Sequence, residues 1–363
     1  MIKRLIFCTF RDNKGATGGP GGVLFLQKNI LGTKINGIKC IYQFNIIKLR
    51  LGPLKIIINK LLFFIKFYPI NDAYFFCHDI ETGNLLAQMG KKYSLIYHHQ
   101  GPLVEEITNF GKKLSKHKIN QISQKERNAF VHAQTIHFPS NGAADMYFSS
   151  GKANCTKKEV NVSIPLYNVI PKVAPIKPDN LNLNYDKAYI TLFSLGTLTI
   201  AKGQDQTIAF IKEFSKVSLK PIRYILVGKG PLKDKLLIEL EKIKKEIPTF
   251  KYIYFESLPH STVMYIHKIS DIYIMLHRIS IFDFATLEAM SQSSAIILSK
   301  VGGNLDFNKE NNIIYAEDIN NNYTSLNNID INSLKNKNYR VFCNFFSEKA
   351  FIKQYENILT KII

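Results

Sequence analysis

One acidic side chain lies where a helix is expected to be apolar. The predicted helix Phe284–Gln292 has an apolar stripe, and the 3.6-residue period places Glu288 on it beside Leu287. A carboxylate held away from water needs donors, because burying even a neutral polar group without a partner costs about 2 to 7 kcal/mol. Two neighbouring hydroxyl groups of a sugar would supply them. The alternative is that Glu288 lies at the rim of the stripe and reaches solvent.

Histidines follow two predicted buried strands. The strand Ala73–Cys77 runs into His78-Asp79, and the strand Leu95–Tyr97 runs into His98-His99. A single histidine is usually a structural group, but in open α/β sheets the carboxyl ends of parallel strands gather at the edge where ligands bind. We therefore expect a site at this edge, and the sequence leaves open whether His98 or His99 lies in it.

The elements around Glu288 follow one another with few spare residues. Asp271–Leu276 is a predicted strand, residues 277–283 form a loop before the helix, and Ala295–Leu298 is a second short strand. Val301–Asn304 then supplies two glycines directly after that strand. Because ligands bind outside the carboxyl ends of such strands, this unit predicts a ligand-binding crevice.

The whole chain repeats this organisation in two halves. At 363 residues it exceeds the limit of about 250 to 300 for a single core. Each half begins with a strand, a glycine-containing loop and a helix: Ile2–Phe10 precedes residues 15–23, and Ala188–Leu195 precedes residues 196–203. The segment Ile164–Asp179 contains four prolines and is the predicted linker. We predict an N-terminal domain of residues 1–170, joined by a C-terminal helix of about residues 346–363, and a C-terminal domain of residues 171–345.

The net charge and the cysteines of the chain indicate which partners and metal sites to expect. The formal charge of +20 implies an anionic partner, although the abundance of Lys, Ile and Asn is also what AT-rich coding would produce. No zinc finger or RNA-binding motif accompanies the charge, so we expect no nucleic-acid partner. The five cysteines are scattered and lack Cys-x-x-Cys spacing, which favours reduced thiols in the cytoplasm and no cysteine zinc site.

Two apolar segments decide whether the sequence predicts a signal peptide or a membrane-spanning helix. The run at Met1–Phe7 ends at Arg11-Asp12 and is interpreted as a buried strand rather than a signal peptide. The segment Leu54–Tyr68 is too short to span a bilayer, which needs about 20 apolar residues. Its Lys55 and Lys66 fall on one helical face, so it is either a core helix or an interfacial one, and the sequence favours a core helix.

The order and spacing of these motifs resemble the retaining GT-B glycosyltransferases, particularly the family-4 group (glycosyl transferases group 1), which use nucleotide-sugar donors. No single motif is specific, and their succession along nearly the whole chain carries the resemblance. The matching motifs are residues 18–23, His78-Asp79, His98-His99, residues 194–196 with Lys202-Gly203, residues 227–231, Phe255–Pro259, residues 287–290 and residues 301–304.

The resemblance implies an α/β fold of the GT-B class, with two Rossmann-like domains facing each other across a cleft and a C-terminal helix crossing between them. The N-terminal domain would bind the acceptor and the C-terminal domain the donor. Catalytic roles would fall to His98 or His99 beside the transferred sugar, Lys202 at the donor diphosphate and Glu288 at the ribose. Implied donor contacts are Gly21, Gly22, Gly196, Thr197, Lys202, Gly228, Leu258, Ser280, Phe282, Asp283, Phe284 and Glu288.

Two positions depart from the family pattern. Ser280 stands eight residues before Glu288, where the family commonly has Glu, and Thr197 stands five residues before Lys202, where it commonly has Arg. Loss of the Arg removes a charge-assisted contact worth about 1.5 to 3 kcal/mol. Either Lys202 and nearby lysines compensate, or donor binding is impaired. Asp283 either contacts the sugar or caps the helix that follows.

The mechanism implied is transfer with retention at the anomeric carbon, by same-face attack assisted by the leaving phosphate. No Asp-x-Asp tripeptide occurs, and we expect neither metal nor another cofactor. The expected partners are a nucleotide-sugar donor and a lipid-linked or surface-polysaccharide acceptor, as in lipopolysaccharide or capsule biosynthesis. We expect a cytoplasmic protein with peripheral contact to the anionic inner face of the membrane. The alternative is a catalytically weak GT-B-like subunit that stabilises a partner glycosyltransferase.

Overall fold

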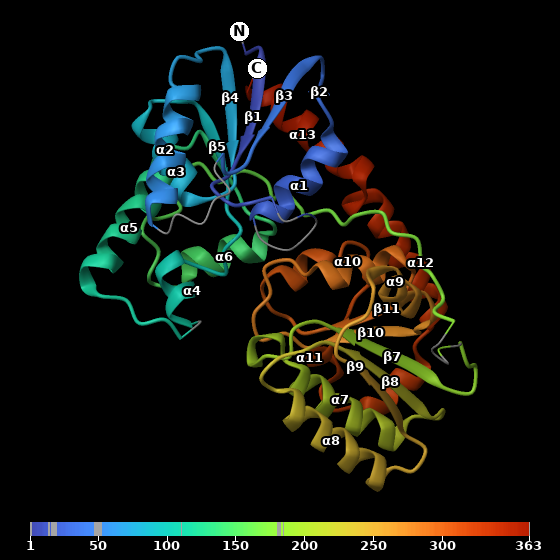
Figure 1. Ribbon diagram of the computed structural model, residues 1–363. Coiled ribbons are helices and arrows are strands. Elements are labelled where there is room, and N and C mark those ends of the chain that lie inside the picture. Colours follow the sequence, from blue (N-terminus) through green and yellow to red (C-terminus); the bar gives the residue numbers. More distant parts are fainter. Residues whose placement is uncertain are drawn as a thin grey trace. The chain divides into compact units, whose positions relative to one another are not determined.

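The chain folds as two compact units in the computed structural model, which describes residues 2–13, 15, 20–46, 53–109, 111–179, 183 and 185–362. The first unit comprises Met1–Pro171 and Glu348–Ile363, and the second comprises Lys172–Ser347 (Figure 1). Residues 16–19 of the predicted N-terminal glycine loop lie outside the described residues. Each unit is an α/β domain built around its own sheet, so the predicted pair of Rossmann-like domains is confirmed.

The first unit is built on a six-stranded sheet in the order β2-β3-β1-β4-β5-β6. All its pairs are parallel except β2 with β3. Ignoring the short β2, the order is that of a doubly wound sheet that reverses between β1 and β4. The strands are β1 (Arg4–Cys8), β2 (Lys34–Ile35), β3 (Ile38–Gln43), β4 (Ala73–Cys77), β5 (Tyr93–Ile96) and β6 (Thr135–His137).

Helices cover the first sheet, and the last helix of the chain is one of them. The ring of Tyr355 packs on Phe7 of β1 and Phe76 of β4, and its hydroxyl accepts from Gln27 Nε2 at 2.6 Å. The end of the chain therefore completes the core of the first unit. The helices are α1 (Pro20–Leu31), α2 (Pro53–Phe67), α3 (Ile80–Gln88), α4 (Leu103–Asn109), α5 (Lys116–Val131), α6 (Asn141–Ser149) and α13 (Glu348–Ile362).

The helix α2 differs from the core helix that the sequence favoured. Its Phe63 and Phe67 are buried against the sheet, but several apolar side chains on the opposite side are exposed. The preference for a core helix is therefore wrong, because only one of two apolar faces is covered. Within the described ranges, no helix is both long and apolar enough to cross a membrane.

The second unit contains a six-stranded parallel sheet in the order β12-β11-β10-β7-β8-β9. This is the strand order of the dinucleotide-binding Rossmann sheet, which reverses between β7 and β10. The strands are β7 (Ile190–Leu195), β8 (Ile222–Val227), β9 (Lys251–Phe255), β10 (Ile272–Met275), β11 (Ala295–Leu298) and β12 (Ile314–Tyr315).

The helices of the second unit alternate with these strands. Short 3-10 turns η1 and η2 lie in the segments after β7 and β11, where glycine-containing loops were predicted. The helical elements are η1 (Ile200–Lys202), α7 (Gln204–Val217), α8 (Lys233–Glu246), α9 (His260–Ile269), α10 (Phe284–Ser291), η2 (Gly302–Phe307), α11 (Ala316–Ile319), η3 (Tyr323–Asn328), α12 (Ile331–Val341) and η4 (Phe342–Phe346).

We predict that Gly203→Ala destabilises the protein by about 3 kcal/mol or more. Gly203 has a φ of 70°, and an added Cβ would lie 1.8 Å from the carbonyl oxygen of Leu276. The control Gly90→Ala has a similar φ of 64° with no atom within 4 Å of the added Cβ, so it should cost only about 1 to 2 kcal/mol. Calorimetric unfolding of both variants measures the difference, and equal losses would contradict the predicted clash.

Candidate functional site

Charged side chains gather where the strand order of the second sheet reverses. Lys202 follows β7 in η1, and His277 and Asp283 follow β10. Lys202 Nζ lies 2.6 Å from Asp283 Oδ1, and His277 Nε2 lies 3.6 Å from the same oxygen. Ligands of sheets with this order bind at such a reversal, so the cluster occupies the expected position of a nucleotide site.

Asp283 has two roles in this cluster. Its Oδ2 accepts from the backbone N–H of Thr286 at 3.1 Å and so caps α10. Burial by itself raises the pKa of Asp283, but Lys202 and His277 outweigh it and hold the pKa well below its usual range. Burial lowers the pKa of His277. Asp283 is therefore an ionised cap that also pairs with Lys202, and the contact with a sugar stays a prediction.

Glu288 is buried within the second unit and has histidine neighbours. Its Oε1 lies 2.8 Å from His260 Nε2, and its Oε2 lies 3.8 Å from His267 Nε2. Burial alone raises the pKa of Glu288, but the two histidines outweigh it and lower the pKa. The residue is 8% exposed, so the alternative that Glu288 reaches solvent is wrong.

Sequence reasoning did not identify these histidines. His260 begins α9, directly after the matching motif Phe255–Pro259. His260 and His267 are seven residues apart and so share one helical face, which is the signal that the sequence offered. The hydrogen bond to Glu288 raises the pKa of His260, whereas burial lowers the pKa of His267. The ion pair at Glu288 is therefore formed mainly with His260.

Glycines let the loops after β7 and β8 meet. A Cβ on Gly228, which has a φ of 156°, would lie 1.9 Å from the carbonyl oxygen of Gly196. Only glycine fits that contact, and both residues were predicted donor contacts. Thr197 is exposed beside them, and its carbonyl accepts from Gln204 Nε2 at 3.0 Å.

The remaining predicted donor contacts differ in burial and in the polar groups that a donor could reach. Ser280 is 4% exposed, and its Oγ has no hydrogen-bond partner among the described residues. The ring of Phe282 packs on Phe307 with centroids 4.4 Å apart, so its side chain belongs to the core. Leu258 and Phe284 are half-buried. The Ser280 hydroxyl is thus a buried polar group without a partner among the described residues. The Phe282 ring is in the core, so Phe282 could contact a donor only through its backbone.

In the first unit, the histidines at the ends of β4 and β5 make different contacts. His78 Nδ1 lies 3.0 Å from His98 Nε2, and the two rings are stacked. Burial lowers the pKa of His98 to about 3 and the pKa of His78 well below its usual value, so both are neutral at pH 7. His99 Nδ1 instead lies 3.1 Å from Glu106 Oε1 on α4. Both candidates lie at the predicted edge, and the choice of the one that contacts the sugar stays a prediction.

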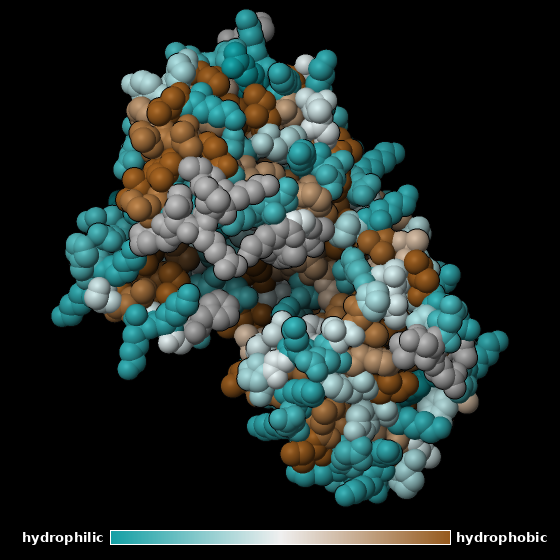
Figure 2. Space-filling view, in the orientation of Figure 1, coloured by the Kyte–Doolittle hydropathy of each residue, from teal (hydrophilic) through white to brown (hydrophobic). Residues whose placement is uncertain are grey.

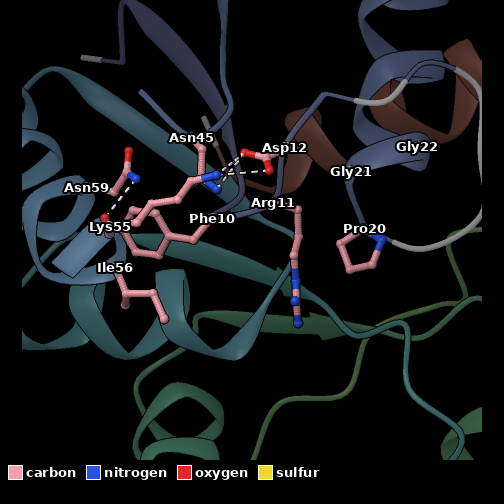
Figure 3. A pocket seen from close by; sticks show the side chains of 10 residues that line it. All are labelled: Phe10, Arg11, Asp12, Pro20, Gly21, Gly22, Asn45, Lys55, Ile56 and Asn59. Carbon is pink, nitrogen blue, oxygen red and sulfur yellow. Dashed lines mark hydrogen bonds and ion pairs between the residues drawn. The ribbon is translucent and has the colours of Figure 1, made fainter. Parts of the chain in front are cut away.

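Gly21 and Gly22 line a cavity of about 460 Å³ in the first unit (Figure 3). A Cβ on Gly21 would lie 2.7 Å from the carbonyl oxygen of Asp12, so glycine lets α1 begin against the loop after β1. Lys55 Nζ donates to Asp12 Oδ2 at 3.0 Å, and the Arg11 side chain stands between Phe10 and Pro20 in the view. The cavity has both polar and apolar lining, and its charged groups are Arg11, Lys55 and Asp12. The contact of both glycines with the donor diphosphate stays a prediction.

Residues 179–342 match the family described as glycosyl transferases group 1. This part of the chain is a group 1 glycosyltransferase domain. A search of curated proteins gives no match for the chain.

Solved structures extend the likeness to the full length of the chain. A sucrose-phosphate synthase from Thermosynechococcus elongatus has 14% identity and a TM-score of 0.67, over 100% of this chain and 99% of that one. The lipopolysaccharide outer core galactosyltransferase WaaB has 15% identity and a TM-score of 0.65, over 99% of this chain and 100% of that one. Anabaena HepE in complex with UDP and glucose has 14% identity and a TM-score of 0.61, over 99% and 100%. These likenesses show that the chain has the GT-B fold.

We predict that His260→Gln lowers stability only in acid. Pairing with Glu288 raises the pKa of His260 above its unfolded value of about 6.5, so the pair stabilises fully below that pH and is lost as pH rises through the folded pKa. The His260 side chain is 40% exposed, so the stabilisation is below about 1 kcal/mol. Thermal unfolding should separate the variant from wild type at about pH 5.5 and not at about pH 9. A constant difference across this range would refute the assignment.

Proposed function

We propose that the protein transfers a sugar from a UDP-sugar to a lipid-linked or surface-polysaccharide acceptor, with retention of the anomeric configuration. The main support is the cluster of Lys202, Asp283 and His277, which lies where the strand order of the second sheet reverses. This cluster lies inside the region that matches glycosyl transferases group 1. The choice of uridine is supported by neighbours solved with UDP, including HepE and the pneumococcal O-GlcNAc transferase GtfA.

Lys202 would bind the donor diphosphate, whose negative charge grows as the bond to the sugar breaks. The side chain is 32% exposed, and its ammonium group can exchange or share its bond to Asp283 with a phosphate oxygen. The amino end of α10 adds a favourable dipole for the same anion. Because these positive groups offset the negative charge of the diphosphate, we propose that donor binding requires no metal.

Glu288 would accept from the ribose hydroxyls. Its Oε1 is bonded to His260, whereas its Oε2 is 3.8 Å from His267, beyond hydrogen-bond distance. We therefore assign Oε2 to the ribose. The partnerless Ser280 Oγ and His277 Nδ1 are further polar atoms that the transferred sugar or a phosphate would satisfy.

The proposed reaction needs no enzyme nucleophile. The acceptor oxygen forms a bond to the anomeric carbon on the same face from which the diphosphate departs, and the bond from that carbon to the phosphate oxygen breaks. The proton of the acceptor hydroxyl goes to the leaving phosphate oxygen. The products are the glycoside and the nucleoside diphosphate, so atoms and charge balance without a cofactor.

The acceptor would bind to the first unit, where His98 or His99 contacts the transferred sugar. The formal charge of +20 is consistent with an acceptor carried at an anionic surface, since each Lys or Arg near such a surface contributes about 1 kcal/mol. We place the reaction at the cytoplasmic face of the inner membrane, in lipopolysaccharide or capsule biosynthesis. A subunit that only stabilises a partner enzyme is not favoured, because it would need neither Lys202 nor Glu288.

We predict that UDP raises the melting temperature of the wild-type protein in EDTA more than ADP, GDP or CMP does. Lys202→Ala should weaken UDP binding by about ten- to a hundredfold, the value of a lost charge-assisted bond. The matched control is Lys216→Ala, which removes an exposed lysine of the same unit that pairs with Glu213. Calorimetric titration measures the affinities. Failure of every nucleotide to bind would overturn the proposed function.

We predict that Glu288→Gln weakens UDP binding by about tenfold or more, because a carboxylate that accepts from hydroxyl groups is lost. The same variant should bind 2′,3′-dideoxyuridine diphosphate as wild type does, since this analogue lacks both hydroxyls. Parallel titrations with the two nucleotides isolate the contact. An equal loss for both would show that Glu288 acts through the fold and not through the ribose.

A further inference from the structure

The helix α2 is attached to the first unit by one narrow stripe. Asn59, Phe63 and Phe67 recur every four residues and are each at most 2% exposed. The ring of Phe63 packs on Phe10 at 5.2 Å, and the ring of Phe67 packs on Phe75 at 5.8 Å. These contacts fix the rotation of α2, and they determine which side chains point outward.

The side of α2 opposite this stripe is apolar and exposed. On the helical period its members cover one continuous arc centred about 150° from Phe63 and containing none of the lysines of α2. We call this arc the outer face of α2: Leu54 (60% exposed), Ile57 (62%), Leu61 (57%), Phe64 (38%), Ile65 (61%) and Tyr68 (53%). Figure 2 shows hydrophobic side chains gathered over this helix. Surface helices normally present polar side chains there, and a contiguous exposed apolar patch marks an interaction site.

The surroundings of the outer face are cationic. The segment of residues 13–71, which contains α2, carries nine Lys and Arg side chains and no Asp or Glu. Lys66 Nζ donates to the amide oxygen of Gln43, and Lys91 Nζ donates to the carbonyl oxygens of Tyr68 and Ile70. These acceptors are neutral, and neither lysine forms an ion pair with another residue that the structure describes.

We propose that the outer face of α2 docks on an anionic lipid bilayer, with its apolar side chains in the boundary between headgroups and acyl chains. An amphipathic helix with aromatic and aliphatic residues on one side and flanking cations lies in the plane of such an interface. The combination favours a bilayer over a second copy of the chain, because two copies would bring these like charges together.

This inference deepens the proposed function and rests on it for the identity of the acceptor. Lys55, Ile56 and Asn59 of α2 also line the cavity that holds Gly21 and Gly22 (Figure 3). A helix lying in the interface would therefore place that cavity at headgroup depth. A lipid-linked acceptor could then enter with its phosphate beside Arg11 and Lys55 while its chain stays in the bilayer.

The first experiment is co-sedimentation of the full-length protein with vesicles. The triple variant Ile57→Ser, Leu61→Ser, Ile65→Ser should bind vesicles of phosphatidylglycerol and phosphatidylcholine at least about tenfold more weakly than wild type. The control Leu219→Ser, Ile238→Ser makes the same change at sites that are 84% and 57% exposed in the second unit, and it should bind as wild type does. Lys66→Gln with Lys91→Gln should lower binding to these vesicles and not to vesicles of phosphatidylcholine alone.

The second experiment measures insertion directly. The chain contains no tryptophan, so Leu61→Trp creates the only one. Its emission should shift to the blue on anionic vesicles and be quenched by brominated acyl chains, whereas Leu219→Trp should show neither effect. Unchanged emission of Leu61→Trp on vesicles would overturn the proposal.

UDP binding separates this inference from the proposed function. The triple serine variant should bind UDP as wild type does, because it changes only outward side chains. Vesicle binding without UDP binding would leave the docking surface intact and refute the transferase assignment. A wild-type dimer that the triple variant converts to monomer, without vesicle binding, would assign the outer face to a second copy and overturn the proposal.

Discussion

Lys202 reaches Asp283 because Gly203 has no side chain. The chain leaves β7, makes one 3-10 turn and passes against the carbonyl of Leu276 at the end of β10. This backbone contact brings together the loops of two strands that are neighbours in the sheet but about 80 residues apart in sequence. The contact between Lys202 and Asp283 depends on it, because the strand order selects the two loops and the glycine lets them touch.

Asp283 shows how one side chain can meet two requirements at this reversal. As a cap it satisfies a backbone N–H at the start of α10, and as an anion it compensates Lys202. Its carboxylate is therefore a negative charge beside the proposed diphosphate site. A phosphate that enters must compete with a counter-ion already in place. This competition weakens phosphate binding, but Asp283 also holds Lys202 in a defined position, which offsets part of the loss.

Much of the fold could be predicted from hydrophobic periodicity. The strands β4 and β11 have the predicted bounds, and α10 ends one residue before its predicted end. The partners of Glu288 could not be predicted, because His260 lies on a different helix, and only the topology brings the two together. The exposure of α2 escaped prediction for another reason. When nearly every face of a helix is apolar, periodicity cannot say which face the sheet covers. The ring of Phe282 packs in the core, which its motif did not indicate, and a contact of Phe282 with the donor stays a prediction.

The return of α13 to the first unit has a consequence for how the protein is made. Phe7 and Phe76, at the centre of the first sheet, are covered by Tyr355, which leaves the ribosome after the whole second unit. The second unit is contiguous and can fold during synthesis, whereas the first must wait for its final helix. Until then part of its sheet is bare. We therefore expect the second unit to fold before the first during translation, and nascent chains that stall before residue 355 to expose part of the first sheet to chaperones.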